Sequence, residues 1–84
     1  EQLPATMSIY PNPSSGNFTV TMNLTDDNSD KKTLQIINMS GQIIKRLNIA
    51  NQNKLDIKID KPGVYLILLE TSKNVITKKL VVMH

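Results

Sequence analysis

The sequence predicts an all-β fold, an immunoglobulin-like antiparallel β-sandwich of about seven short strands. Apolar residues alternate with polar ones in several short runs, and turn-forming residues separate these runs about every ten positions, a spacing typical of β-sandwiches. Ten Ile, five Val and seven Thr, against only two Ala, also favour the pleated surface of a sheet. No stretch shows the three-and-four spacing of an amphipathic helix. A small β-barrel fits the same pattern and stays open as an alternative.

The first two strands are predicted at residues 7–10 and 18–24. Proline cannot donate to a sheet ladder, so Pro11-Asn12-Pro13 ends the first strand, and a turn through Gly16 follows. In the second strand, apolar and polar residues alternate regularly, which predicts one buried and one exposed face. The apolar members are Phe18, Val20, Met22 and Leu24.

The remaining strands follow at intervals. Residues 33–38 and 42–49 are predicted to form a hairpin around Gly41, because glycine supplies the positive φ of a tight turn. Residues 55–59 alternate again, and Pro62-Gly63 ends that strand. The nearly continuous apolar run at residues 64–69 predicts a central strand covered on both sides, since a half-exposed strand would alternate. The last strand is predicted at residues 75–82.

Size and charge exclude several classes of protein. A chain of 84 residues allows one small domain with a thin core. Its longest apolar run, residues 64–69, is too short to cross a bilayer, so membrane insertion is not expected. The net charge is +3, but the basic residues are scattered and only three residues are aromatic. Nucleic-acid binders concentrate both kinds of side chain on one face, so no nucleic-acid partner is expected.

No catalytic site, metal site or cofactor is expected. The chain has no cysteine, and its lone histidine, His84, is the last residue and cannot anchor a catalytic triad. Two carboxylate pairs could act in acid–base chemistry, but one lies in a polar loop and the other on the exposed face of a strand; they are Asp26 with Asp27 and Asp56 with Asp60. Oxygen ligands for calcium gather in the same loop without the glycine and glutamate of an EF-hand; they are Asp26, Asp27, Asn28 and Asp30.

Four motifs follow one another in a specific order along the chain. They are IYPNPSSGNF at residues 9–18, IINMSGQII at 36–44, KPGVY at 61–65 and TKKLVV at 77–82. In this order and spacing, over about residues 7–82, they resemble the type A C-terminal sorting domain of the Bacteroidetes type IX (Por) secretion system.

The resemblance implies an address label rather than an enzyme. Such domains are engaged by an outer-membrane translocon after the cargo reaches the periplasm, and are usually removed by a cysteine-protease-like sortase at the cell surface, so the protein would be secreted or on the cell surface. The resemblance implies a recognition element made of Lys78, Lys79, Leu80, Val81 and Val82, supported by Gly63 and Tyr65. It implies family turns at Pro11, Asn12, Pro13, Gly16 and Gly41. Met83 and His84 depart from the usual basic ending.

The expected organisation is a linker at residues 1–6, attached to an upstream cargo domain, followed by the sorting domain at residues 7–84. No export signal opens the sequence, so such a signal is expected on an upstream part of a longer protein. A partner is expected to read the terminal strand by adding a strand to its edge. The alternative function is an immunoglobulin-like or fibronectin-like accessory module that binds carbohydrate or protein, although three aromatic residues offer such a module little binding surface.

Overall fold

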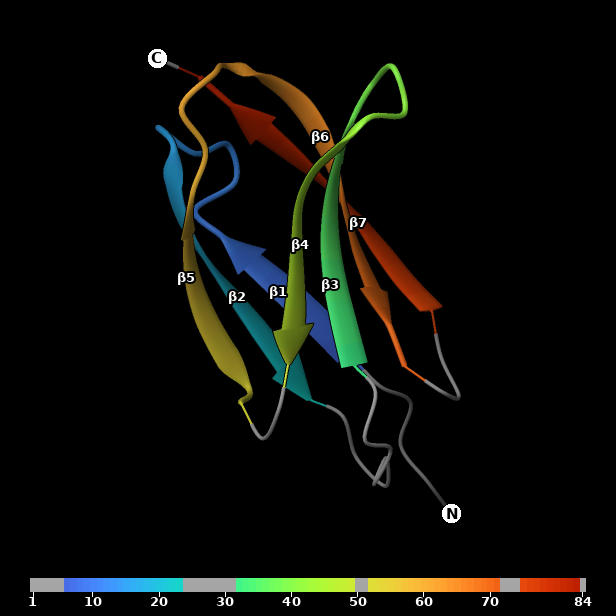
Figure 1. Cartoon of the computed structure of the whole chain (residues 1–84). Helices are drawn as coiled ribbons and strands as arrows, with labels where there is room; N and C mark the ends of the chain where they lie inside the picture. The colour runs from blue at the N-terminus through green and yellow to red at the C-terminus, as the bar shows by residue number, and fades with distance from the viewer. Residues whose placement is uncertain (1–5, 24–31, 50–51, 72–74, 84) are drawn as a thin grey trace.

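The computed structural model describes residues 6–23, 32–49, 52–71 and 75–83, which form seven β-strands (Figure 1). The strands are β1 (Thr6–Tyr10), β2 (Asn17–Asn23), β3 (Lys32–Asn38), β4 (Ile43–Ile49), β5 (Lys54–Lys58), β6 (Gly63–Glu70) and β7 (Val75–Val82). The predicted strands are confirmed to within one residue at each end. Leu24, the calcium candidates at residues 26–30, His84 and residues 1–5 of the predicted linker lie outside the described residues.

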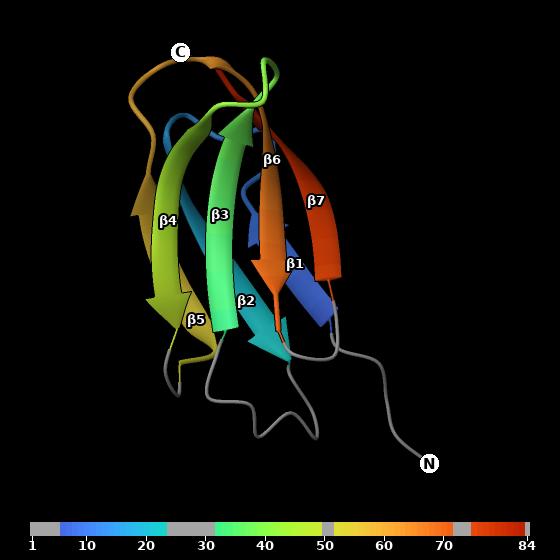
Figure 2. The same ribbon diagram turned by 45° about the vertical axis from the view of Figure 1, so that its right-hand side comes forward.

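The strands form two antiparallel sheets packed face to face, as the prediction of an immunoglobulin-like sandwich requires (Figure 2). The smaller sheet has the order β1-β2-β5, and the larger has the order β4-β3-β6-β7. This division of the strands into two sheets is the immunoglobulin-like arrangement, with β4 beside β3. The sandwich is confirmed and the barrel alternative is wrong, because β4 and β5 end their sheets without pairing with each other.

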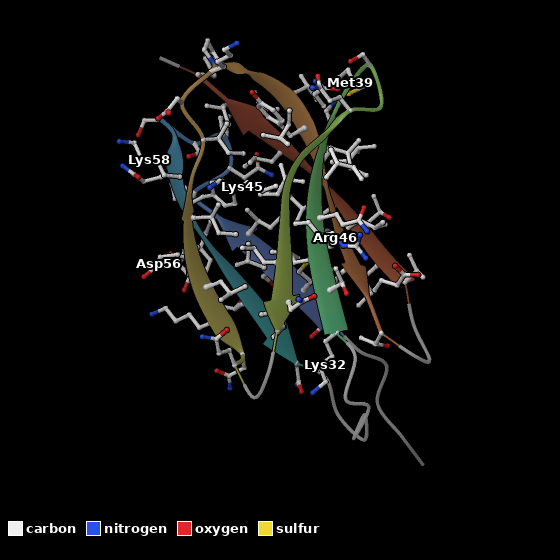
Figure 3. The ribbon with its side chains drawn as sticks, viewed as in Figure 1. Lys32, Met39, Lys45, Arg46, Asp56 and Lys58 are labelled. Atoms are coloured by element: carbon white, nitrogen blue, oxygen red, sulfur yellow. The ribbon has the colours of Figure 1, made fainter. Side chains whose placement is uncertain are left out.

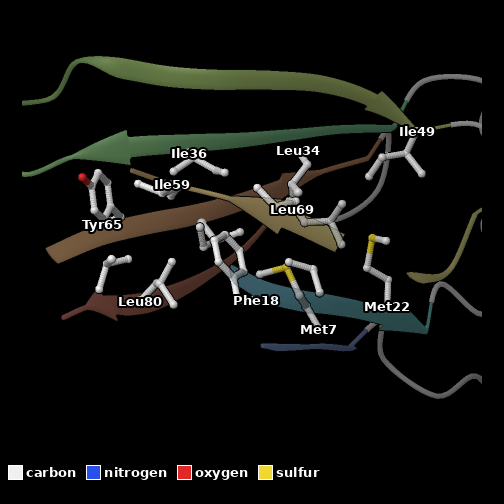
Figure 4. Close-up of a cluster of buried hydrophobic side chains, with 14 residues drawn as sticks. Met7, Phe18, Met22, Leu34, Ile36, Ile49, Ile59, Tyr65, Leu69 and Leu80 are labelled. Carbon is white, nitrogen blue, oxygen red and sulfur yellow. The ribbon is translucent and has the colours of Figure 1, made fainter. Parts of the chain in front are cut away.

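The core lies between the sheets and is built from alternate residues of each strand (Figure 4). Period-two alternation sends one side chain in and the next out, so each sheet contributes one face to the core. The inner side chains of β2 confirm the predicted alternation, and Val20 at its centre is fully buried. The buried apolar residues are Met7, Phe18, Val20, Met22, Leu34, Ile36, Ile49, Ile57, Ile59, Tyr65, Ile67, Leu69, Leu80 and Val82.

Strand β6 is central within its sheet but is covered on one side only. Its inner side chains are buried, and they are those of Tyr65, Ile67 and Leu69. Its outer side chains are only half-buried, and no described strand lies over them; they are Val64, Leu66 and Leu68. The prediction of cover on both sides is therefore wrong: the apolar run reflects a core on one side and an unusually apolar outer surface on the other.

The hairpin between β3 and β4 confirms the predicted turn at Gly41, whose φ is 90°. A Cβ at Gly41 would meet nothing within 4 Å, so the backbone conformation rather than space requires glycine there. The Asn38 side chain completes the turn, since its Oδ1 accepts hydrogen bonds from the backbone N–H groups of Ser40 and Gln42. Asparagine side chains commonly cap turns in this way. The prediction for this hairpin named only Gly41.

Candidate functional site

The segment that follows β1 lies against the outer edge of β7, which ends the larger sheet. The side-chain amide of Asn12 bridges two backbone groups of β7: its Nδ2 donates to the carbonyl oxygen of Lys79 at 2.8 Å, and its Oδ1 accepts from the N–H of Val81 at 3.1 Å. A primary amide presents a donor and an acceptor side by side, as a peptide group does. Asn12 therefore occupies part of the edge where a neighbouring strand would bind.

Ser14 continues this contact through its backbone. Its N–H donates to the carbonyl oxygen of Val81 at 2.8 Å, and its own carbonyl oxygen accepts from the N–H of Met83 at 2.7 Å, which makes a parallel bridge with Val82. The Ser14 hydroxyl is turned back into its own loop, where it accepts from the N–H of Gly16 at 2.9 Å and donates to the carbonyl oxygen of Asn17. Ser14 is 2% exposed. The Ser14 side chain therefore stabilises the loop itself, while the Ser14 backbone binds β7.

The segment at residues 11–14 and the terminal strand, about seventy positions apart, therefore form one site. We name the part of it that solvent reaches the motif surface: Pro11, Asn12 and Pro13, together with Lys78, Lys79 and the half-buried Val81. Gly16, with a φ of 125°, is buried behind it, and its carbonyl oxygen accepts from the N–H of Ile59 at 2.8 Å. Sequence reasoning found every member of this surface but missed Ser14, because nothing in the sequence distinguishes it from Ser15.

The predicted recognition residues on β7 divide by exposure. Lys78 and Lys79 are exposed and Val81 is half-buried, so these side chains can meet a partner. Leu80 and Val82 are 0% and 2% exposed and belong to the core. In the folded domain, Leu80 and Val82 therefore hold the strand in place by packing into the core.

Gly63 and Tyr65 shape the turn between β5 and β6. The Tyr65 hydroxyl donates to the carbonyl oxygen of Lys61 at 2.6 Å, and its ring is 5% exposed. A tyrosine near the start of the penultimate strand that bonds back to the preceding turn is the tyrosine corner of immunoglobulin-like folds. Gly63 has a φ of 152°, which side chains rarely adopt. Both residues act on the fold, and Gly41 belongs to the separate β3–β4 turn.

The described residues offer no catalytic arrangement. Two open hollows mark the surface: one of about 530 Å³ is lined partly by Tyr10, Asp56 and Lys58, and one of about 360 Å³ partly by Ile44 and Lys61. Asp56 accepts a hydrogen bond from the Thr19 hydroxyl at 2.8 Å. The Oδ1 atom of Asp60 lies 4.0 Å from Nζ of Lys58. Within the described ranges, no three acidic, histidine or cysteine residues gather to hold a metal ion, and no helix is long and apolar enough to cross a membrane.

Comparison with known proteins identifies the family. A search among curated proteins finds no match. The family model described as the secretion system C-terminal sorting domain matches residues 8–83, which include both parts of the motif surface and the tyrosine corner. The family's members are sorting signals rather than enzymes in general, and the proteins that carry them are secreted or found at the cell surface. The chain therefore belongs to the C-terminal sorting domains of the type IX secretion system and serves as the sorting signal of the cargo protein to which it is attached.

Proposed function

We propose that the motif surface is the element that the outer-membrane translocon of the type IX system engages after the cargo has reached the periplasm. The observation that carries this proposal is the pair of hydrogen bonds from Asn12 to Lys79 and Val81. These bonds join the two parts of the family motif into one exposed surface. A partner that contacts it reads both ends of the domain at once.

The motif surface carries both positive charges and rigid apolar rings. Lys78 and Lys79 are exposed on an edge strand, where their charges can attract an acidic partner over a distance of about a Debye length. Pro11 and Pro13 are exposed on either side of Asn12 in the chain and present rigid apolar rings. The buried Leu80 and Val82 fix the register of this surface relative to the core.

Removal of the domain by a sortase belongs to the same proposal. The linker was predicted at residues 1–6, but Thr6 already belongs to β1, so the link to the cargo is proposed for residues 1–5. Cleavage within residues 1–5 would release the cargo and leave all seven strands of the domain intact. Mass spectrometry of the new C-terminus of an exported cargo would locate the cut; a cut within β1 or beyond would contradict this placement.

An export assay tests the proposal. Residues 1–84 are fused to a fluorescent cargo with a periplasmic export signal, in a bacterium that has this secretion system. We expect surface or medium fluorescence for the full domain, and periplasmic retention when residues 77–84 are removed. Retention of both fusions would contradict the function.

Because that truncation removes most of β7, a second variant separates recognition from folding. Replacing Lys78 and Lys79 together by Gln changes only exposed charges of the motif surface. The matched control is Lys54→Gln, an exposed lysine of β5 on the smaller sheet. We expect the double variant to lower export at least about tenfold, the effect of losing 1.4 kcal/mol of binding, and the control to leave it unchanged. Equal export by both variants, with both folded, would remove the two lysines from the recognition element.

A further inference from the structure

Strand addition along the C-terminal half of β7 is not open to a partner while the loop after β1 is bonded there. In an antiparallel sheet, alternate residues of an edge strand point their N–H and C=O groups away from the sheet. On β7 these outward groups include the carbonyl oxygens of Lys79 and Val81 and the N–H groups of Val81 and Met83. All four are hydrogen-bonded to Asn12 or Ser14. For a partner to add a strand at this part of β7, as the sequence predicts, the loop that holds Asn12 and Ser14 would first have to detach.

Both edges of the larger sheet also carry an inward-pointing lysine. Register places Lys45 of β4 opposite Ile36, Ile36 opposite Ile67, and Ile67 opposite Lys78 of β7. The middle pair is fully buried, and the lysines at the two ends of the row are exposed. In Figure 3, Lys45 extends between β4 and β5, at the open side of the sandwich. Inward charges on edge strands discourage pairing with other strands.

The β4 edge has a second protective feature. Its register with β3 shifts between Ile36 and Ile37, so that Ile44 has no direct partner and forms a bulge. Bulges bend and twist an edge strand away from the flat geometry that another strand needs. Since the C-terminal half of β7 is capped and β4 is bulged, the edges of the larger sheet are less suited to a partner than its outer face.

The outer faces of the two sheets differ in polarity. The outer face of the smaller sheet, on β1, β2 and β5, is polar; its residues include Ser8, Thr19, Thr21, Lys54 and Asp56. On the larger sheet, every strand has at least one apolar side chain at an outer position, and the remaining outer positions are polar; the polar ones are Thr33, Gln35, Arg46, Asn48, Glu70, Thr77 and Lys79. The apolar residues that lie together are Ile37, Ile43, Val64, Leu66, Leu68 and Val81, and we name this set the outer apolar face; Val75 lies apart from it, opposite Glu70.

The outer apolar face is continuous across the sheet. One row runs from Ile43 through Ile37 and Leu66 to Lys79, and Val64 lies opposite Val81 in a neighbouring row. Ile43 is 50% exposed, while Leu66 in the middle is half-buried. An ordinary solvent-facing sheet surface would alternate to polar residues here, so a contiguous apolar surface marks an interaction site.

Positive charges lie on the two opposite sides of this face. Arg46 of β4 is opposite Gln35 in the outer row beside Ile37, and in Figure 3 it lies on the other side of its strand from Lys45. Lys79 closes the apolar row on β7. The two cations lie in adjacent rows on strands that are three spacings, about 14 Å, apart, with Ile37, Leu66 and Leu68 between them. The described acidic residue on this face is Glu70, at the far end of β6.

We propose that the outer apolar face is the docking surface for a protein of the secretion machinery whose own surface is apolar at the centre and acidic on both flanks. This inference rests on the proposed function, because Lys79 and Val81 belong both to the motif surface and to this face. Five of the six side chains of this face are half-buried within the sheet, as at the surfaces that proteins present to one another, and Ile43 is half exposed at the β4 edge.

Paired substitutions in the export assay test the docking surface. Ile37→Gln with Leu66→Gln places two polar side chains at the centre of the outer apolar face, where the two residues are direct cross-strand partners. The matched control is Thr21→Gln on the polar face of the smaller sheet. We expect export to fall at least about tenfold for the double variant and to stay unchanged for the control, with thermal unfolding and near-ultraviolet circular dichroism confirming that both domains fold.

Arg46→Glu gives an independent measurement that leaves the apolar packing intact. Arg46 is exposed and lies outside the motif surface, so it reports on the far side of the face. We expect export to fall by a similar factor, because the glutamate repels an acidic partner, and Arg46→Lys to restore export. If the Gln double variant fails to fold, the Arg46 pair decides the question.

Each outcome separates this inference from the function on which it rests. Retention of the wild-type fusion would contradict the sorting function itself. Normal export of Arg46→Glu, together with reduced export of the Lys78 and Lys79 variant, would keep the motif surface and overturn the docking face. Flotation of the purified domain with vesicles of phosphatidylcholine and phosphatidylglycerol, lost in the Gln double variant, would assign the face to a membrane and also overturn it.

Discussion

The hydroxyl of Tyr65 lies 2.6 Å from the carbonyl oxygen of Lys61, four residues earlier in the chain. This bond closes the turn between β5 and β6, and the Tyr65 ring packs into the core beneath it. We expect Tyr65→Phe to lower the free energy of unfolding by about 1 kcal/mol, or the thermal midpoint by about 4–8 °C, because the ring stays while the Lys61 oxygen loses its partner. Tyr10→Phe, at a half-exposed ring, is the control and should melt like the wild type. Equal thermal midpoints for the two variants would show that the bond from Tyr65 to Lys61 does not stabilise the fold.

Asn12→Ala should loosen the terminal strand locally. The substitution removes both side-chain hydrogen bonds to β7, including the one to the N–H of Val81. We expect the Val81 amide to exchange its hydrogen about tenfold faster, which corresponds to about 1.4 kcal/mol of lost local protection. Hydrogen exchange followed by nuclear magnetic resonance measures this rate. Asn48→Ala, at an exposed position of β4, should leave it unchanged; wild-type protection of Val81 without Asn12 would show that Ser14 alone holds the edge.

Replacing Lys45 and Lys78 together by Ile should cause self-association. The two lysines end the row that contains Ile36 and Ile67, and without them the row would be apolar from edge to edge. Edge strands without inward charges pair more readily with other chains. Sedimentation velocity at increasing concentration should show dimers or larger species for the double variant. Lys54→Ile, on the outer surface of the smaller sheet, should sediment as the wild type does; the same behaviour in the double variant would refute edge protection.

Leu80→Ala should destabilise the whole domain. Leu80 is fully buried, and its replacement removes core contacts and leaves a cavity, at a cost of about 3 kcal/mol. In a domain of this size that is a large part of the total stability. Urea denaturation measures the change, with Val75→Ala as the control on the same strand, where the side chain is 62% exposed and the cost should stay below about 0.5 kcal/mol. A small effect at Leu80 would place its role in partner contact rather than in the core.

Local pattern was sufficient to predict the strands and most of the core. Alternation in β2 identified Phe18, Val20 and Met22 as inward-facing, since a period of two leaves one choice of face once one residue is buried. The same logic failed at β6, where Val64, Leu66 and Leu68 are as apolar as their buried neighbours. Pattern cannot distinguish a face covered by the core from an apolar face that is left open.

The motif surface shows a different limit. Sequence motifs marked both Asn12 and Lys79, yet nothing local predicts that an asparagine side chain will bond to a backbone 67 positions away. Tyr65 was likewise predicted to support recognition, and nothing local predicts that its hydroxyl donates to the carbonyl oxygen of Lys61. In both cases the missing information is which segments pack together, and this depends on the tertiary arrangement of the sheets.

Because Asn12 bonds to Val81, the motif surface can form only in a chain that contains both the loop after β1 and strand β7. The segment that holds Asn12 is made before β7, and the site is complete only when β7 has been made and has paired with β6. A product that stops before β7, or that has lost this strand to proteolysis, keeps the first motif but has no bonded surface to present. If the export machinery binds this composite surface, as we propose, it would reject a product truncated before β7 without any separate proofreading step.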